Sequence, residues 1–306
     1  MQKSLFVTLL FLCSLCYSCS REEVVEEVVD NNQVPDPGSV PQIKVVNYVN
    51  RLFIDLLGRT PTDIERRKES DALIEQGLSF ESRRSLVHKL QSDTIYVEGD
   101  SSYKIAYYNR LYDLAKARLL EGASDDEFSQ QIGIMRFGVQ VARLEGDSVR
   151  VFRNLQQIQR NEAVLLSRIA LRNGSISLSQ MYARMLNNSI YDVINMNAFN
   201  FINASFDDLL DRFPTENEFN IAYPVIENNE GRVFFGSYIE NKFDYCRVLT
   251  EHKAFFEGMV RWTYLNLMGR YPTPNEVYYR LKNYMQDPDY PKFQQELLIS
   301  NEYAQF

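Results

Sequence analysis

A short motif occurs three times in this chain and constrains its fold more than any other feature of the sequence. Each copy reads Arg-x-Pro-Thr-x-x-Glu, and the copies comprise Arg59, Pro61, Thr62 and Glu65, then Arg212, Pro214, Thr215 and Glu218, then Arg270, Pro272, Thr273 and Glu276. At ordinary residue frequencies, the probability of one match at a given position is on the order of 10⁻⁵. Three copies therefore indicate a repeated structural unit.

The motif predicts two helices joined by a tight turn. Gly58 and Gly269 directly precede the motif arginine in the first and third copies, where a helix would end in the left-handed conformation. The proline prevents the helix from continuing, and Thr with Glu three residues later is typical of a capping box. In the middle copy Asp211 replaces the glycine, so a different turn is expected there. The arginine is expected to bond helix carbonyls or the capping glutamate, with ligand binding as the alternative.

The first and third copies also end alike, in Ser92-Asp93-Thr94-Ile95-Tyr96 and Ser300-Asn301-Glu302-Tyr303. Together with the Leu-Gly-Arg-x-Pro-Thr-x-x-Glu core, this pattern resembles an uncharacterised helical repeat domain of bacterial surface and secreted proteins. The core also looks like a segment of uncharacterised domains from planctomycete-type proteins. The resemblance covers residues 45–96 and 258–303, with a weaker echo at 203–255. It implies a bacterial envelope scaffold and brings no catalytic residues with it.

The N-terminus has the pattern of an export signal. Lys3 gives a positive start, and residues 5–15 are almost wholly apolar, a run too short to span a bilayer. The run ends in Cys16-Tyr17-Ser18-Cys19, which resembles the lipobox of bacterial lipoproteins, although Cys16 and Tyr17 depart from the usual residues. The resemblance implies a signal peptide over residues 1–18 and acylation of Cys19, for example by palmitate. An ordinary secretory signal cut near Ser18 is the alternative.

Residues 19–42 are expected to form an acidic, flexible tether after the lipidated cysteine. The segment is rich in Glu and Asp and carries three prolines, and both features oppose packing. An acidic cluster at this place also resembles the surface-export signals of Bacteroidota lipoproteins, and a solvated spacer explains it equally well. The expected location is therefore the cell outer membrane, with the body at the cell surface or in the periplasm.

The rest of the chain predicts an all-α fold in three segments: a first helical repeat over 43–98, an inserted bundle of long helices over 99–175, and a second helical region over 176–306 with two further motif copies. Apolar residues in 102–172 recur at helical spacing, which predicts a long helical hairpin or three-helix bundle. These stripes, which include Leu155 and Ile169, are expected in the core rather than on an exposed docking face. Residues 225–238 break the pattern and predict a loop or one small β-hairpin.

Residues 187–201 have an unusual composition of asparagines among aromatic residues. Such asparagines commonly cap broken helices and satisfy buried backbone groups. The same residue types line carbohydrate-binding grooves, so the alternative is a ligand surface formed by Tyr191, Asn195, Asn197 and Asn200.

Composition narrows the function classes further. The net charge of −8 argues against a nucleic-acid partner, and the body has a single cysteine, Cys246, and no metal-ligand, nucleotide-binding or hydrolase motif. The expected function is a non-catalytic envelope lipoprotein, without metal or cofactor, that acts as a scaffold or binding component with an envelope protein partner. A glycan-binding accessory lipoprotein is the alternative. A hydrolase acting on polysaccharide is third and would need a carboxylate pair such as Asp207 and Asp211.

Overall fold

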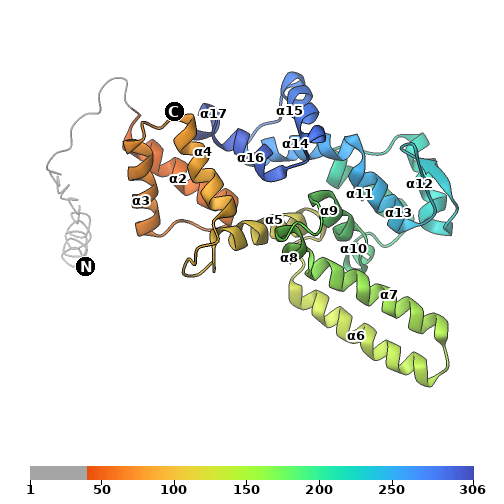
Figure 1. Cartoon of the computed structure of the whole chain (residues 1–306). Helices are drawn as coiled ribbons and strands as arrows, with labels where there is room; N and C mark the ends of the chain where they lie inside the picture. The colour runs from red at the N-terminus through yellow and green to blue at the C-terminus, as the bar shows by residue number, and fades with distance from the viewer. Residues whose placement is uncertain (1–39) are drawn as a thin grey trace, which may run out of the picture. The chain divides into compact units, whose positions relative to one another are not determined.

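The computed structural model describes residues 40–306, and these residues form one compact unit, Val40–Phe306. Within this range the chain folds into sixteen α-helices and one two-stranded sheet (Figure 1). The prediction of an all-α fold with one small β-hairpin is therefore confirmed. Cys19 and the expected signal peptide lie outside the described residues. Gln42, expected as the last tether residue, is the first residue of a helix.

The helices follow one another with short connections. The first repeat consists of α2 (Gln42–Leu57), α3 (Asp63–Glu75) and α4 (Phe80–Ser92). The middle of the chain consists of α5 (Tyr103–Leu119), α6 (Asp125–Leu144), α7 (Ser148–Leu165), α8 (Ser167–Arg172), α9 (Leu178–Leu186) and α10 (Ser189–Ile194). The remainder consists of α11 (Ala198–Leu210), α12 (Glu216–Asn228), β1 (Arg232–Phe234), β2 (Ser237–Ile239), α13 (Lys242–Glu251), α14 (Lys253–Met268), α15 (Pro274–Gln286), α16 (Tyr290–Leu298) and α17 (Asn301–Ala304).

The first and last repeats pack against each other, so that the two ends of the described chain lie side by side (Figure 1). Helix α2 contacts α17, and α4 contacts α16. The Tyr48 hydroxyl donates to the carbonyl of Leu298 at 3.1 Å, and the Gln91 amide donates to the carbonyl of Pro291 at 2.9 Å. These contacts close residues 40–306 into one body.

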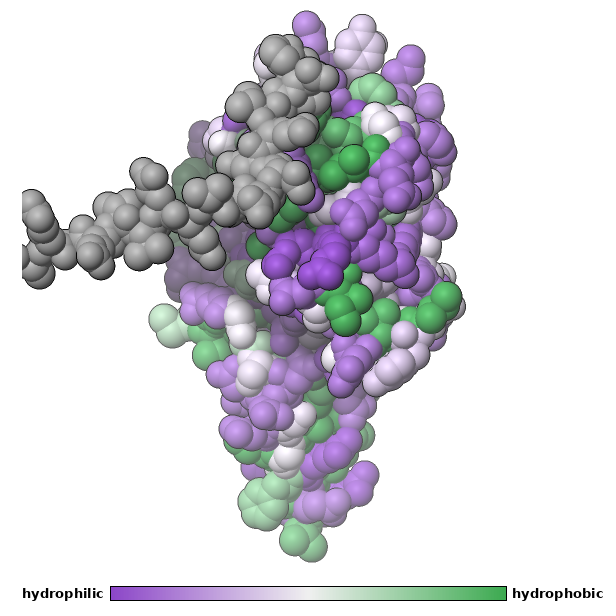
Figure 2. Space-filling view, turned by 90° about the vertical axis from the view of Figure 1, so that its left-hand side faces the viewer, coloured by the Kyte–Doolittle hydropathy of each residue, from purple (hydrophilic) through white to green (hydrophobic). Residues whose placement is uncertain are grey.

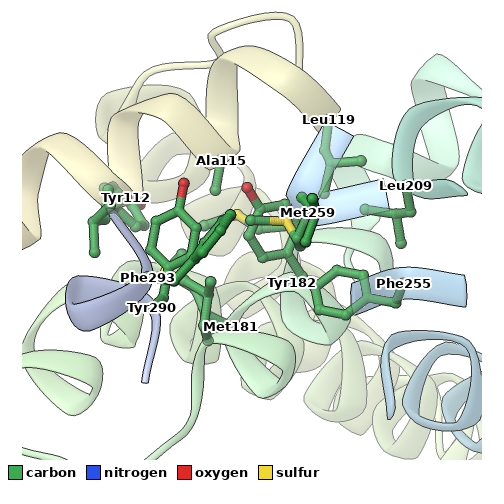
Figure 3. Packing of buried hydrophobic residues seen from close by; sticks show 14 of the residues in the cluster. Tyr112, Ala115, Leu119, Met181, Tyr182, Leu209, Phe255, Met259, Tyr290 and Phe293 are labelled. Carbon is green, nitrogen blue, oxygen red and sulfur yellow. The ribbon is translucent and has the colours of Figure 1, made fainter. Parts of the chain in front are cut away.

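One hydrophobic core joins all three expected segments. Figure 3 shows its centre, where α5, α9, α14 and α16 meet around closely packed aromatic and methionine side chains. The residues labelled there are all buried: Tyr112, Ala115, Leu119, Met181, Tyr182, Leu209, Phe255, Met259, Tyr290 and Phe293. The repeats and the insert are thus parts of one packed unit.

Helices α6 and α7 form the predicted long hairpin. Its inner stripe is buried as expected at Phe128, Ile132, Val139 and Ala142. Leu155 and Ile169, also expected in the core, are 45% and 41% exposed, so that part of the prediction is wrong. Leu155 is uncovered because α6 packs mainly against α7, which leaves the outer faces of the pair exposed, whereas Ile169 lies on the short helix α8. Apolar residues of the pair that remain exposed are Ile134, Phe137, Leu144, Val149 and Phe152, and the lower end of Figure 2 shows green side chains among purple ones.

The segment expected as a loop or hairpin contains both helix and hairpin. Helix α12 continues through Pro224 to Asn228, and the antiparallel pair β1–β2 follows, with Arg232 opposite Ile239. Phe234 and Ile239 are buried against the main core, which fixes the small sheet to the body.

Candidate functional site

The three motif copies have the same geometry. Each threonine caps its helix and closes a capping box with the glutamate, at α3, α12 and α15. Each arginine bonds both oxygens of that glutamate: Arg59 to Glu65 at 2.9 and 2.7 Å, Arg212 to Glu218 at 2.8 and 2.7 Å, and Arg270 to Glu276 at 3.0 and 2.8 Å. The arginine guanidinium is thus committed to the turn itself.

The middle copy does not turn differently, contrary to the expectation for Asp211. This residue adopts the left-handed conformation with φ of 55°, close to the 75° of Gly58 and 68° of Gly269. Aspartate tolerates this conformation better than most residues, because its short polar side chain bonds locally. The first and third copies, by contrast, end differently: Tyr303 is buried, whereas Tyr96 is 74% exposed.

Hydrogen bonds from the motif arginine and threonine stabilise each motif glutamate in its ionised form. Burial alone would raise the pKa of Glu65, but the hydrogen bonds from Arg59 and Thr62 outweigh it and hold the pKa at about 2. Glu218 follows the same balance, and Arg270 lowers the pKa of Glu276, again to about 2 in each. The copies differ in burial, with the Glu65 side chain 11% exposed and the Glu276 side chain 30% exposed.

The asparagine side chains of residues 187–201 mainly form hydrogen bonds with backbone groups. Tyr191 is fully buried and its hydroxyl donates to Asp208 at 3.2 Å. The Asn195 amide donates to the carbonyl of Tyr191, and Asn197 caps α11 by accepting from the backbone of Asn200. Asn197 and Asn200 are exposed, and none of the four residues proposed as a ligand surface lines the cleft among α7, α9 and α13.

A cleft of about 760 Å³ lies among α7, α9 and α13, and no sequence motif predicted it. Its walls carry six side-chain amides, which are Gln156, Gln159, Gln180, Asn187, Asn229 and Asn241. They also carry four cations, which are Arg160, Arg184, Lys242 and Arg247. Glu251 is the one carboxylate among the lining residues. The volume falls within the roughly 300–1,000 Å³ of ordinary ligand sites.

The four cations differ in how far they are neutralised. Lys242 forms an ion pair with Asp192, and Arg247 lies 3.3 Å from Glu251 and 3.6 Å from Asp244. Arg184 donates to the carbonyl of Ala163 at 3.1 Å. No carboxylate within residues 40–306 lies within ion-pair distance of Arg160 or Arg184.

The wall of the cleft also contains an amide oxygen without a hydrogen-bond partner among the described residues and two apolar side chains. Asn187 is 7% exposed, and its side-chain oxygen has no hydrogen-bond partner among the described residues. Phe243 is 58% exposed and Ile176 is partly buried, so the wall also offers apolar surface.

Burial raises the pKa of Cys246 to about 12, which keeps this thiol protonated at neutral pH. Within the part of the chain that the structure describes, no three His, Cys, Asp or Glu residues are grouped so as to hold a metal ion.

Sequence reasoning missed the cleft because its residues are spread over 156–251 without a common spacing. The nearest local indication is the run Gln156-Gln157-Ile158-Gln159-Arg160, a polar face on an otherwise amphipathic helix. Such a run usually forms a solvated surface. Only the packing of α7 against α9 and of α9 against α13 turns it into the wall of a cleft.

Fold and cleft together define an all-helical body with one small β-hairpin and an amide- and cation-lined cavity. Comparisons with protein-family models, with curated proteins and with solved structures found no match to this chain.

Proposed function

We propose that this protein is a lipid-anchored, non-catalytic binding component of a bacterial cell envelope, held at the outer membrane by Cys19. The observation that carries the binding part is the cleft among α7, α9 and α13, whose six amides and four cations converge from distant parts of the chain. Convergent polar groups in a cavity of this size are the usual features of a ligand site. A scaffold role for the helical repeats is compatible with such a site.

The anchor rests on the sequence, in which Cys19 follows a short apolar run and Ser18. None of the helices in residues 40–306 combines the length and the apolar character that crossing a bilayer requires. Acyl chains attached to the thiol and to the N-terminal amine of Cys19 would supply the membrane affinity, since each buried methylene contributes about 0.8 kcal/mol.

Replacing Cys19 by alanine is expected to move the protein from the membrane fraction to the soluble fraction, because the thiol that carries the lipid is lost. Fractionation of cells, with mass spectrometry of the mature N-terminus, measures both location and acylation. Cys13→Ala is the matched control, since this residue lies within the expected signal peptide and should leave anchoring unchanged. Unaltered membrane association of the Cys19 variant would show that the protein is held by something else.

Glycan binding is the second candidate function, and two features of the cleft favour it. Phe243 presents an exposed ring at the wall, and aromatic faces stack on the apolar faces of sugar rings. Amide side chains both donate and accept hydrogen bonds, as sugar hydroxyls require. Hydrolysis of a polysaccharide has less support, because the only lining carboxylate, Glu251, is paired with Arg247.

Filling the cleft should weaken ligand binding without unfolding the protein. Ala163 lies on the cleft wall, so Ala163→Phe is expected to weaken binding at least about 10-fold, measured by calorimetry against a panel of neutral and acidic oligosaccharides and peptides. Gln140→Phe adds the same ring to an exposed position on α6, away from the cleft, and should bind as the wild type does. If no panel member binds the wild-type chain, or if Ala163→Phe binds as tightly, the cleft is not the binding site.

A further inference from the structure

We infer that the cleft selects an acidic oligosaccharide, whose carboxylate or sulfate groups contact Arg160 and Arg184. This inference rests on the proposed binding function and names the chemical class of its ligand. It starts from a contrast in charge: the whole chain carries −8, yet the cleft walls carry four cations and one carboxylate. A concentration of positive charge on an acidic protein marks a local site for anions.

Arg160 and Arg184 are the cations left for a ligand. The charges of Lys242 and Arg247 are already matched by Asp192 and by Glu251. Arg160 on α7 and Arg184 on α9 have no carboxylate partner within residues 40–306. They line the same cavity from different helices, so both side chains are available to one ligand there.

The Arg184 side chain is held in place for this role. Its Nη1 donates to the carbonyl of Ala163 and lies 3.5 Å from the Ser167 hydroxyl, and these contacts connect α9 to the end of α7 and the start of α8. A guanidinium has five N–H donors, and the bonds above use only Nη1. The remaining N–H groups suit a planar oxyanion, because arginine binds carboxylates through two parallel hydrogen bonds.

The rest of the lining favours a sugar chain over an acidic peptide. Six amides give donors and acceptors all round the cavity, which matches hydroxyl groups that both donate and accept. The unsatisfied side-chain oxygen of Asn187 marks a place where the wall lacks a donor. Phe243 adds an exposed ring face for the apolar side of a pyranose. At about 760 Å³ the cavity is also far larger than one inorganic anion requires.

The test compares one saccharide with and without its charge. Isothermal titration calorimetry of the mature, acylated chain in detergent would use oligogalacturonate and its fully methyl-esterified form, which has the same sugar rings and no carboxylates. The free acid is expected to bind at least about 10-fold more tightly and to weaken as salt is added, because guanidinium–carboxylate contacts are screened.

Arg160→Gln tests the named residue, whose side chain forms no hydrogen bond or ion pair within residues 40–306. The variant should lose at least about 10-fold in affinity for the acid and little for the ester, and Arg160→Lys should retain part of the difference. Arg153→Gln is the matched control, because this exposed arginine lies on the same helix outside the cleft. Thermal melting of each variant checks that the fold is unchanged.

The outcomes separate this inference from the function on which it rests. Equal affinity for acid and ester, or an Arg160→Gln variant that binds the acid normally, would overturn acid selection while leaving a binding cleft. Tighter binding of oligoglutamate than of any saccharide would assign the cleft to acidic peptides and overturn the sugar. Binding of no panel member at all would remove the proposed function itself.

Discussion

A valine or alanine at position 258 is expected to destabilise the protein by about 3–5 kcal/mol or to prevent folding altogether. Gly258 lies in α14 where that helix crosses α11, and a Cβ atom there would lie 1.9 Å from the carbonyl oxygen of Leu209. The atom in the way belongs to the backbone of α11, so no side-chain rotation relieves the contact. The two helices would have to separate, and the core that they share would open with them.

Chemical denaturation of the mature chain measures this effect as the free energy of unfolding. Gly133→Ala is the matched control, because it lies within α6 and a Cβ atom there meets nothing within 4 Å. That substitution should stabilise the protein by up to about 1 kcal/mol, as glycine is a poor helix former. Equal unfolding midpoints for Gly258→Ala and the wild type would show that α11 and α14 do not approach this closely.

Glu65→Gln is expected to lower the free energy of unfolding by about 2–4 kcal/mol. The carboxylate of Glu65 accepts two bonds from Arg59, two from the backbone and hydroxyl of Thr62, and one from the Tyr103 hydroxyl. A glutamine amide nitrogen cannot accept a hydrogen bond, so two donors would face each other at one of these positions. Arg59 would keep Asp100 as its countercharge and lose that of Glu65. Glu276→Gln makes the same change in the more exposed third copy and should cost about 1 kcal/mol or less.

The same carboxylate gives the stability a defined pH dependence. The pKa of Glu65 is lowered to about 2 in the fold, against 4.5 for an unperturbed glutamate, so its contribution is complete above about pH 5. The contribution decreases as the pH falls through 4.5 and is lost near pH 2. The wild type should therefore lose its advantage over Glu65→Gln as urea midpoints are compared from pH 7 down to pH 3. Asp208, whose pKa burial raises to about 6, is common to both proteins and does not affect the difference.

A constant difference between the two proteins across this range would contradict the lowered pKa. Equal stability at pH 7 would contradict the network itself, because the five bonds to the Glu65 carboxylate stabilise its ionised form.

Local features of the fold follow from the sequence because their causes are local. A capping box needs only residues three apart, so the caps at Thr62, Thr215 and Thr273 could be predicted from the motif. The hairpin of α6 and α7 follows likewise from helical periodicity and a short connection. For the motif arginine, the sequence predicts either helix carbonyls or the capping glutamate as its partner. In all three copies the partner is the glutamate six residues later.

Burial was harder to predict, because an apolar stripe shows that a face prefers to be covered and does not show what covers it. Leu155 has the spacing of a core residue and is 45% exposed, since no other element packs on that side of α7. Gly258 has no special spacing at all, yet the close approach of α11 makes it one of the most constrained positions in the chain.

By itself, then, the sequence determined the repeat, its capped turns and the helical class, all of which depend on residues a few positions apart, and it predicts acylation of Cys19. The tertiary structure alone decided that the repeats and the insert share one core, and that polar side chains from α7, α9 and α13 enclose a cleft. The physical reason is the sequence separation of the contacts. Hydrogen bonds within a turn join residues a few positions apart, so their spacing along the chain predicts them. The charge left unmatched on Arg160 and Arg184 depends on which helices pack together.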